Sequence, residues 1–366
     1  MKKFFLKNEV MCIAILAAVI TSFFVHPDAE YLGYFDFKTL TCLFCTLTVV
    51  CALKNVYFFR IVAGEIVRIC KTTRTAVIAL VYITFIGSML IANDMALITF
   101  LPLGYYVLDS TDNDNYMGFT FIMQNIAANL GGMLTPFGNP QNLYLYSYFN
   151  IPTLEFVKIM FLPFIISIAL ITLCCFRVDN NGLKIEKVFE RRIEWKRTSI
   201  YLGLFAFSIA IVFRGIHYLW GLVLIPAALF FLDRKALKKV DYALLVTFCA
   251  FFIFSGNMSR IPAVRNFLGW IIEKNTLIFG VLSCQVMSNV PSAILLSKFT
   301  QNYSQLLVAV NIGGAGTLIA SLASLITFRE YVKREPENSK DYIKEFSLYN
   351  FGILFILLVI MFFVFR

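Results

Sequence analysis

The chain has 366 residues, of which 59% are hydrophobic and only 15% charged, and its formal net charge is +10. An average soluble domain has roughly 25% charged residues, so this composition excludes a soluble globular protein and indicates an all-α polytopic membrane protein. The positive charge lies in loops between apolar runs and not in a nucleic-acid-binding motif, which excludes a nucleic-acid partner and is typical of cytoplasmic loops.

The first half of the chain contains several apolar runs long enough to enter a bilayer, which takes about 20 residues to cross. In chain order, we expect spans at 10–25 and 37–53, an interfacial helix at 54–71, a hairpin at 75–108, a broken span at 116–150 and a span at 153–176. Arg60, Gly64 and Arg68 share one face of the interfacial helix, as in helices that lie along a membrane surface. Asn93 and Asp94 interrupt the hairpin, so we expect it to return to the side from which it enters.

The second half repeats this order after one additional span. We expect a connecting span at 199–213, spans at 216–232 and 241–255, an interfacial helix at 257–275, a hairpin at 276–297, a broken span at 303–328 and a last span at 346–365. A polar loop rich in Lys and Arg, 177–197, is predicted to be cytoplasmic. This orientation places the N-terminus inside and the C-terminus outside.

The most unusual stretch is NLGGMLTPFGNPQNL, residues 129–143, which follows a long apolar run. Proline and glycine interrupt helices. Irregular backbone at membrane depth is tolerated only where protein or a water-filled cavity surrounds it. The ends of a broken helix offer free N–H groups to an anion and free carbonyl groups to a cation. The stretch therefore predicts a broken transmembrane helix at a binding site.

A second copy of this stretch lies in the other half of the chain. When NIGGAGTLIASLASL, residues 311–325, is aligned with residues 129–143, Asn, two Gly, Thr and the final Leu coincide. Upstream, Asn93 matches Asn289. The additional span turns the second copy over, which indicates an inverted-topology repeat with two re-entrant hairpins and two broken helices. The predicted division is a first repeat at 1–176, a cytoplasmic linker at 177–198, a connecting span at 199–215 and a second repeat at 216–366.

Substrate or coupling ions are expected to bind at the hairpin tips and at the helix breaks. The predicted binding residues are Asn93, Asp94, Thr135, Gly138, Asn139, Pro140, Asn142, Ser288, Asn289, Thr317, Ser321 and Ser324. Close backbone approach is expected at Gly131, Gly132, Gly313 and Gly314. Small residues that only mediate helix packing are the alternative.

Six of these side chains are expected to face one shared polar cavity near the middle of the membrane. They are Thr135, Asn139, Asn142, Thr317, Ser321 and Ser324. Replacing Asn142 with Leu should then abolish transport and leave folding nearly normal.

Three segments, ANDMALITFLP (92–102), NLGGMLTPFGNPQNLYLY (129–146) and SNVPSAILL (288–296), resemble the ion transporter superfamily of citrate and dicarboxylate permeases, arsenite permeases and related antiporters. The resemblance implies a homodimer in which a transport domain of two hairpins and two broken helices moves against a fixed scaffold. In the dicarboxylate carriers, Ser-Asn-Thr triplets at the hairpin tips hold substrate and Na⁺. Here the triplets are Ala92-Asn93-Asp94 and Ser288-Asn289-Val290, and the Asn-Asp form is closer to the arsenite-permease and antiporter branches.

Asp94 is the one acidic residue well inside an apolar segment. A carboxylate at that depth is a functional-site hypothesis. Asn93, Asp94 and Asn289 are the candidate ligands of Na⁺, and without a cation a buried carboxylate favours its protonated form, which would make Asp94 a proton carrier. The alternative is a residue that only caps its helix.

These observations favour a secondary active transporter in the cytoplasmic membrane, with no cofactor beyond Na⁺ or H⁺ as coupling ion. The substrate is expected to be a small anion, either a carboxylate or an inorganic oxyanion, moved by an elevator-type mechanism. The first alternative is a Na⁺/H⁺ antiporter that uses Asp94. A membrane enzyme or a non-transporting membrane protein is less favoured, because we find no catalytic cluster in the spans.

Overall fold

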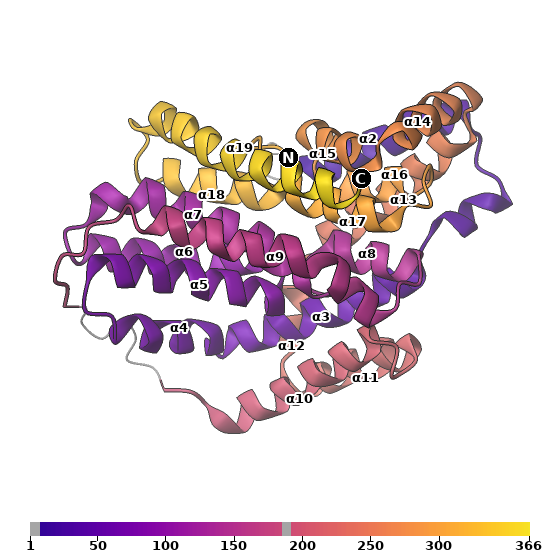
Figure 1. Cartoon of the computed structure of the whole chain (residues 1–366). Helices are drawn as coiled ribbons and strands as arrows, with labels where there is room; N and C mark the ends of the chain where they lie inside the picture. The colour runs from indigo at the N-terminus through magenta and orange to yellow at the C-terminus, as the bar shows by residue number, and fades with distance from the viewer. Residues whose placement is uncertain (1–7, 185–191) are drawn as a thin grey trace.

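A computed structural model describes residues 8–184 and 192–366, and every regular element within these ranges is a helix (Figure 1). The first half contains α2 (Glu9–Phe24), η1 (Ala29–Tyr34), α3 (Phe37–Asn55), α4 (Phe58–Arg68), α5 (Thr73–Ile91), α6 (Asn93–Asp109), η2 (Asp114–Tyr116), α7 (Met117–Gly131), η3 (Gly132–Leu134), α8 (Pro140–Tyr148) and α9 (Thr153–Cys175). The second half contains α10 (Trp195–Val212), α11 (Tyr218–Leu232), α12 (Arg234–Lys238), α13 (Tyr242–Arg260), α14 (Pro262–Lys274), α15 (Thr276–Met287), α16 (Asn289–Leu296), α17 (Tyr303–Ile312), α18 (Leu322–Val332) and α19 (Ser339–Val364).

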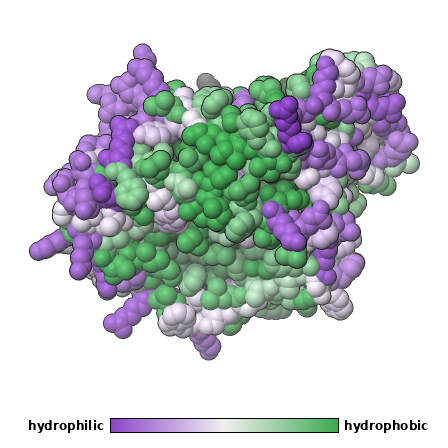
Figure 2. Space-filling view, in the orientation of Figure 1, coloured by the Kyte–Doolittle hydropathy of each residue, from purple (hydrophilic) through white to green (hydrophobic). Residues whose placement is uncertain are grey.

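Five of the described helices, α3, α5, α9, α13 and α19, are long and apolar enough to cross a membrane. Hydrophobic residues cover the middle of the face shown in Figure 2, and hydrophilic residues gather toward its left and upper right edges. A broad apolar surface between polar ends is what a bilayer requires of the protein that spans it. These observations confirm the predicted all-α polytopic membrane protein.

Polar residues before the apolar runs fix where several helices begin. The Asp36 carboxylate accepts a hydrogen bond from the Thr39 backbone N–H at the start of α3 (2.9 Å). The Asp241 carboxylate accepts one from the Leu244 N–H at the start of α13 (3.0 Å). Each of these caps satisfies an N–H group that the helix itself leaves free.

Several helix boundaries differ from the sequence prediction, most clearly in the second half. The last helix begins at Ser339 instead of residue 346, because its first two turns are charged and hydropathy detects only the part that suits lipid. Likewise α13 runs on to Arg260, and the expected interfacial segment begins as α14 only at Pro262, a residue well suited to the first helical position.

Six helices, which we call the scaffold helices, lie beside a central bundle formed by α5–α9 and α15–α19. The scaffold helices are α2, α3 and α10–α13. Within them α2 packs against α13, and α3 packs against α10, α11 and α12. Figure 1 shows α10 and α11 below the rest of the molecule. The two amphipathic helices α4 and α14 connect the scaffold helices to the bundle and expose apolar side chains, namely Val62, Ile66, Ile69, Phe267 and Trp270.

A contact between two helices is matched by a contact between their equivalents in the other half. The element order α2, α3, α4, α5–α6, α7–α8, α9 recurs as α11, α13, α14, α15–α16, α17–α18, α19. Accordingly α2 packs on α13 and α11 packs on α3, and α6 contacts α18 while α16 contacts α8. The contacts follow the order that the sequence repeat predicts. The domain boundaries and the re-entrant course of the hairpins stay predictions.

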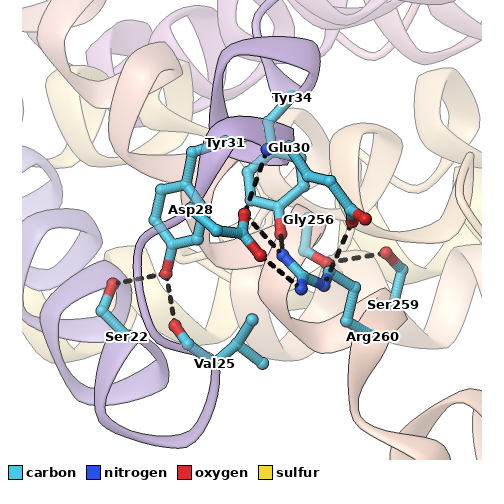
Figure 3. Close-up of polar contacts among 9 residues, drawn as sticks. All are labelled: Ser22, Val25, Asp28, Glu30, Tyr31, Tyr34, Gly256, Ser259 and Arg260. Atoms are coloured by element: carbon cyan, nitrogen blue, oxygen red, sulfur yellow. Dashed lines mark hydrogen bonds and ion pairs between the residues drawn. The ribbon is translucent and has the colours of Figure 1, made fainter.

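An ion-pair cluster joins the segment after α2 to the end of α13 (Figure 3). The Arg260 guanidinium contacts both carboxylate oxygens of Asp28 (2.6 and 3.0 Å), the Glu30 carboxylate (3.3 Å) and the Tyr34 hydroxyl (3.0 Å). Its hydrogen bonds lower the pKa of Asp28 below its ordinary value. The cluster therefore fastens two scaffold helices that come from different halves of the chain.

Candidate functional site

Each helix hairpin turns at one residue with the same unusual backbone. Ala92, between α5 and α6, has φ 64° and ψ 153°, and Ser288, between α15 and α16, has φ 76° and ψ 158°. This region is strained for any residue with a side chain, at a cost of order 1–3 kcal/mol. Strain of this kind clusters at functional sites, and here it occurs at equivalent positions of both halves.

The asparagine that follows each turn adopts the same hydrogen bonds in both halves. The Asn93 side-chain oxygen accepts from the Asp94 N–H (3.0 Å), and the Asn289 oxygen accepts from the Val290 N–H (2.9 Å). Both side chains are buried. The Asn93 amide also donates to Asn129 Oδ1 (3.2 Å), which connects the first hairpin tip to the broken helix.

Both predicted helix breaks are present. The backbone leaves the helix between α7 and α8 and again between α17 and α18. The Thr135 hydroxyl donates to the Met89 carbonyl (3.0 Å), and the Thr317 hydroxyl donates to the Gln285 carbonyl (3.1 Å). Since both acceptors belong to the last turn of a hairpin's first helix, each threonine ties a break to the neighbouring hairpin.

Asn139 and Asn142 are buried in a network of amides that joins the two halves. Asn142 Nδ2 donates to carbonyls at the break, including that of Gly132 (3.2 Å), and its oxygen accepts from Asn311 Nδ2 (2.5 Å). Asn139 Nδ2 donates to Asn311 Oδ1 (3.4 Å) and to the Asn129 carbonyl (3.3 Å). The network thus satisfies carbonyl groups that the broken helices expose.

Ser321 and Ser324 are buried too, and their hydroxyls bond to each other (3.0 Å). Among the paired glycines, a Cβ at Gly131 would lie 2.3 Å from the Phe85 carbonyl oxygen, so this glycine allows α7 to approach α5 closely. A Cβ at Gly132 would lie 2.5 Å from Asn139 Oδ1. At these two glycines, the close contact of the backbone is with neighbouring groups of the protein itself.

The two hairpin tips meet at one small cavity, which we call the tip cavity. Its volume is about 60 Å³. The bundle contributes Asn93, Asp94, Pro140, Gln141, Ser288, Asn289, Val290, Pro291, Ile319, Leu322 and Leu325. The scaffold helices contribute Val10 from α2 and Leu244, Thr247 and Phe251 from α13. The cavity therefore lies between the bundle and the scaffold helices.

Four helices begin at the tip cavity, and their first residues line it. These residues are Asn93 of α6, Pro140 of α8, Asn289 of α16 and Leu322 of α18. The positive end of the helix dipole lies at each of these termini. Some of the first N–H groups are bonded within the protein, namely those of Asp94, Asn289 and Val290. Such termini bind anions without a basic side chain. Two come from each half, so the site is built by both repeats.

Of the residues that the structure describes, Asp94 is the one charged residue that lines the tip cavity. Its Oδ1 atom is buried and accepts no hydrogen bond from the described residues, and the same holds for Oε1 of Gln141, which also lines the cavity. Buried acceptors without donors are costly. A bound cation or a proton on the carboxyl group would satisfy them.

The structure gathers only part of the predicted set at this cavity. Asn93, Asp94, Pro140, Ser288 and Asn289 line it. None of the six side chains expected to share one polar cavity lines the tip cavity, and in the structure they bond to one another, to Asn311 or to backbone carbonyl groups. Those six are Thr135, Asn139, Asn142, Thr317, Ser321 and Ser324.

Sequence reasoning missed Gln141 and Asn311. Gln141 follows directly after the GNP turn, but which side chain of the motif faces the cavity depends on the turn's backbone. Asn311 was visible as the counterpart of Asn129 in the aligned repeat. That alignment was the signal that could have identified it.

Comparison with known proteins agrees with this architecture. The chain is 33% identical over 297 residues to an uncharacterized transporter of Methanocaldococcus jannaschii, covering 80% of this chain and 81% of that protein. It is 28% identical over 327 residues to an inner membrane protein of Escherichia coli, covering 86% of each. A shorter match, 27% identical over 116 residues, covers 31% of this chain and 20% of a Dictyostelium discoideum protein named as transporter arsB.

The family described as citrate transporter matches residues 5–305, which include both hairpin tips and the first break. The relatives are transporters or membrane proteins and not enzymes. With the helical architecture and the paired tips, these matches show that the chain belongs to the citrate transporter family and is a membrane transporter.

Proposed function

We propose that this transporter moves a small anion across the cytoplasmic membrane by secondary active transport coupled to Na⁺ or H⁺. The observation that carries the proposal is the meeting of four helix N-termini at the tip cavity. Among the described residues no Lys or Arg lines this cavity, so an anion would be held by backbone N–H groups and side-chain amides. Binding without a fixed positive charge favours release, which a carrier needs.

The size of the tip cavity favours a small inorganic oxyanion over a tricarboxylate. Its volume of about 60 Å³ is far below the roughly 300 Å³ at which pockets for drug-sized ligands begin. A substrate with three carboxylates would require the bundle and the scaffold helices to separate. A compact oxyanion would need a smaller displacement.

Asp94 is proposed to couple the anion to the cation. Its unpaired Oδ1 and Gln141 Oε1 supply hard oxygen ligands of the kind that Na⁺ prefers, with Asn93 and Asn289 nearby at the tips. A cation at Asp94 would also offset the repulsion between the carboxylate and the bound anion. Protonation of Asp94 would do the same, which is why either ion can serve as the coupling ion.

An elevator-type movement is supported by the position of the site between two groups of helices. The tip cavity is lined by α2 and α13 on one side and by the bundle on the other. The amphipathic helices α4 and α14 join the two groups and suit the membrane interface. We propose that the bundle carries the site past the scaffold helices of a homodimer embedded in lipid. In this proposal residues 54–60 and 233–241 face the cytoplasm.

Uptake by purified protein in liposomes tests the proposal. Labelled phosphate, arsenate, sulfate, succinate and citrate are offered under an imposed Na⁺ or pH gradient, with protein-free liposomes and ionophore-collapsed gradients as controls. We expect accumulation of a small oxyanion that depends on one of the gradients, and little or no accumulation of citrate. Failure of every anion to accumulate, with a folded protein and intact gradients, would contradict the proposal.

A Na⁺/H⁺ antiporter is the second candidate, favoured by the single unpaired carboxylate at the cavity. In that case Asp94 would carry Na⁺ and protons in turn, and no anion would be moved. A pH-sensitive dye in the liposome lumen distinguishes the two. An antiporter moves protons when Na⁺ is added without any transportable anion.

A further inference from the structure

A cavity rich in positive charge lies next to the tip cavity. It has a volume of about 760 Å³, and we call it the basic vestibule. Lys54 from α3, Arg60 from α4 and Lys239 after α12 line it, together with a single acid, Asp241. Lys54 and Lys239 form no ion pair among the described residues. Their charge is therefore not cancelled by a bound carboxylate.

Three segments of the chain contribute residues to the linings of both cavities. In each segment, a residue that lines one cavity lies within two residues of one that lines the other. On α6, Met95 and Ile98 line the vestibule and Asp94 lines the tip cavity. On α13, Ala243 lines the vestibule and Leu244 the tip cavity. The chain start adds the same arrangement, with Asn8 at the vestibule and Val10 at the tip cavity. The cavities are therefore stacked.

Three apolar residues lie at the boundary between the two linings, and we call them the apolar layer. Met95 on the vestibule side and Val10 and Leu244 on the tip-cavity side are all partly buried apolar residues at the boundary. An apolar constriction between two polar cavities resists the passage of ions and water until its side chains move apart.

We propose that the basic vestibule is the anion entry and exit chamber of the site, with Lys54, Arg60 and Lys239 concentrating anions and the layer of Val10, Met95 and Leu244 acting as its gate. The role of the chamber in transport rests on the proposed function, but its anion preference does not. Clefts lined by charge of one sign raise the local concentration of oppositely charged solutes by about tenfold or more. The tip cavity lacks basic residues, so the vestibule supplies the attraction that the site itself does not.

The anion preference can be measured without knowing the substrate. Ile98, on the vestibule wall, is 43% exposed. In the variant Ile98→Cys, the modification rates by an anionic sulfonatoethyl and a cationic trimethylammonioethyl methanethiosulfonate are compared on the full-length protein, with the modified cysteine identified by peptide mass spectrometry. The ratio of the two rates at one thiol cancels differences in the reactivity of that thiol.

We expect the anionic reagent to modify Ile98→Cys about tenfold faster than the cationic one at low ionic strength. Combining the variant with Lys54→Gln and Lys239→Gln should bring the ratio close to one, and high salt should reduce it by screening. Gly33→Cys, exposed in η1 near Asp28 and Glu30, is the matched control and should show no anionic preference. A ratio near one in Ile98→Cys, or a preference unchanged by removing both lysines, would overturn the proposal.

A second readout links the chamber to transport. Lys54→Gln and Lys239→Gln should raise the half-saturating concentration of the transported oxyanion on the vestibule side several-fold and leave the maximal rate nearly unchanged. An unchanged half-saturating concentration would overturn the entry role. Because the labelling result requires no transported anion, its failure and the failure of the proposed function are distinguishable.

Discussion

Asp94 has no charged counterpart in the other half, where Val290 follows the equivalent asparagine. The two half-sites are therefore chemically different although their backbones match. We expect Asp94→Asn to fold normally and to lose the dependence of uptake on the Na⁺ or pH gradient. Gradient-driven accumulation should fall about tenfold, the effect of losing roughly 1.4 kcal/mol of cation binding.

The matched control is Asp109→Asn, which removes a carboxylate at the opposite end of the same helix, α6. That variant should retain gradient-dependent uptake. Unchanged ion dependence in Asp94→Asn liposomes would leave the carboxylate as a helix cap and remove it from the coupling mechanism.

The turn at Ala92 provides a test of the backbone itself. A β-branched side chain is especially unfavourable at positive φ. We therefore expect Ala92→Val to lower the free energy of unfolding by about 1–3 kcal/mol. Glycine adopts this conformation without strain, so Ala92→Gly should be at least as stable as the parent. Thermal unfolding in detergent measures both, and equal stability of the Val and Gly variants would argue against the strained turn.

These residue-scale features were only partly predictable. The sequence identified Asn93, Asp94 and Asn289 because they interrupt apolar runs. It did not identify Ala92, because nothing about an alanine in the sequence indicates that its φ is positive. Whether Gln141 lines the tip cavity depends on the direction of the turn before α8. The identity of the residue does not reveal that direction.

At the scale of elements, buried amides hold the broken helices together. Asn311 of α17 bonds Asn139 and Asn142 beside α8. Replacing Asn311 with Leu leaves the buried Asn142 Oδ1 without its donor, at about 1–3 kcal/mol, and removes one of the two acceptors of Asn139 Nδ2. We expect a clear loss of thermal stability, and a double variant with Asn142→Leu should lose less than the sum of the single changes. The exposed Asn180→Leu is the control, and its stability should not change.

This expectation differs from the sequence-based one. Asn142→Leu was expected to fold nearly normally and to lose only transport, but Asn142 is fully buried and bonded to Asn311 and to three carbonyls. An amide side chain can be recognised in the sequence. Its hydrogen-bond partner, 169 residues away along the chain, is identified only in the folded structure. If Asn142→Leu keeps its stability, the network is not structural.

The Arg260 cluster gives a pH-dependent prediction at the junction of α2 and α13. Arg260→Gln should lower the melting temperature at neutral pH. Because Arg260 lowers the pKa of Asp28, the contribution of this pair is present above the unfolded value of 3.8 and is lost as the pH falls through the folded pKa. The gap between parent and variant should therefore shrink below about pH 4. A gap that stays constant on acidification would contradict the assignment.

At the scale of the whole molecule, the repeat was the most predictable feature. Paired glycines, a threonine and an upstream asparagine recur at equal offsets, and the contacts between helices follow the same exchange of halves. The tip cavity could not be predicted, since it requires four helix starts, α2 and α13 to meet in space. Hydropathy predicts which segments enter lipid, but not which of their ends converge.

The central claim is that an anion binds where α6, α8, α16 and α18 begin. Anomalous diffraction from crystals of the full-length protein grown with selenate or arsenate locates such an anion directly. We predict an ordered peak in the tip cavity, close to the backbone N–H groups of Asn93 and Gln141. An ordered anion elsewhere with the tip cavity free of density, in protein that transports the same anion, would contradict the account.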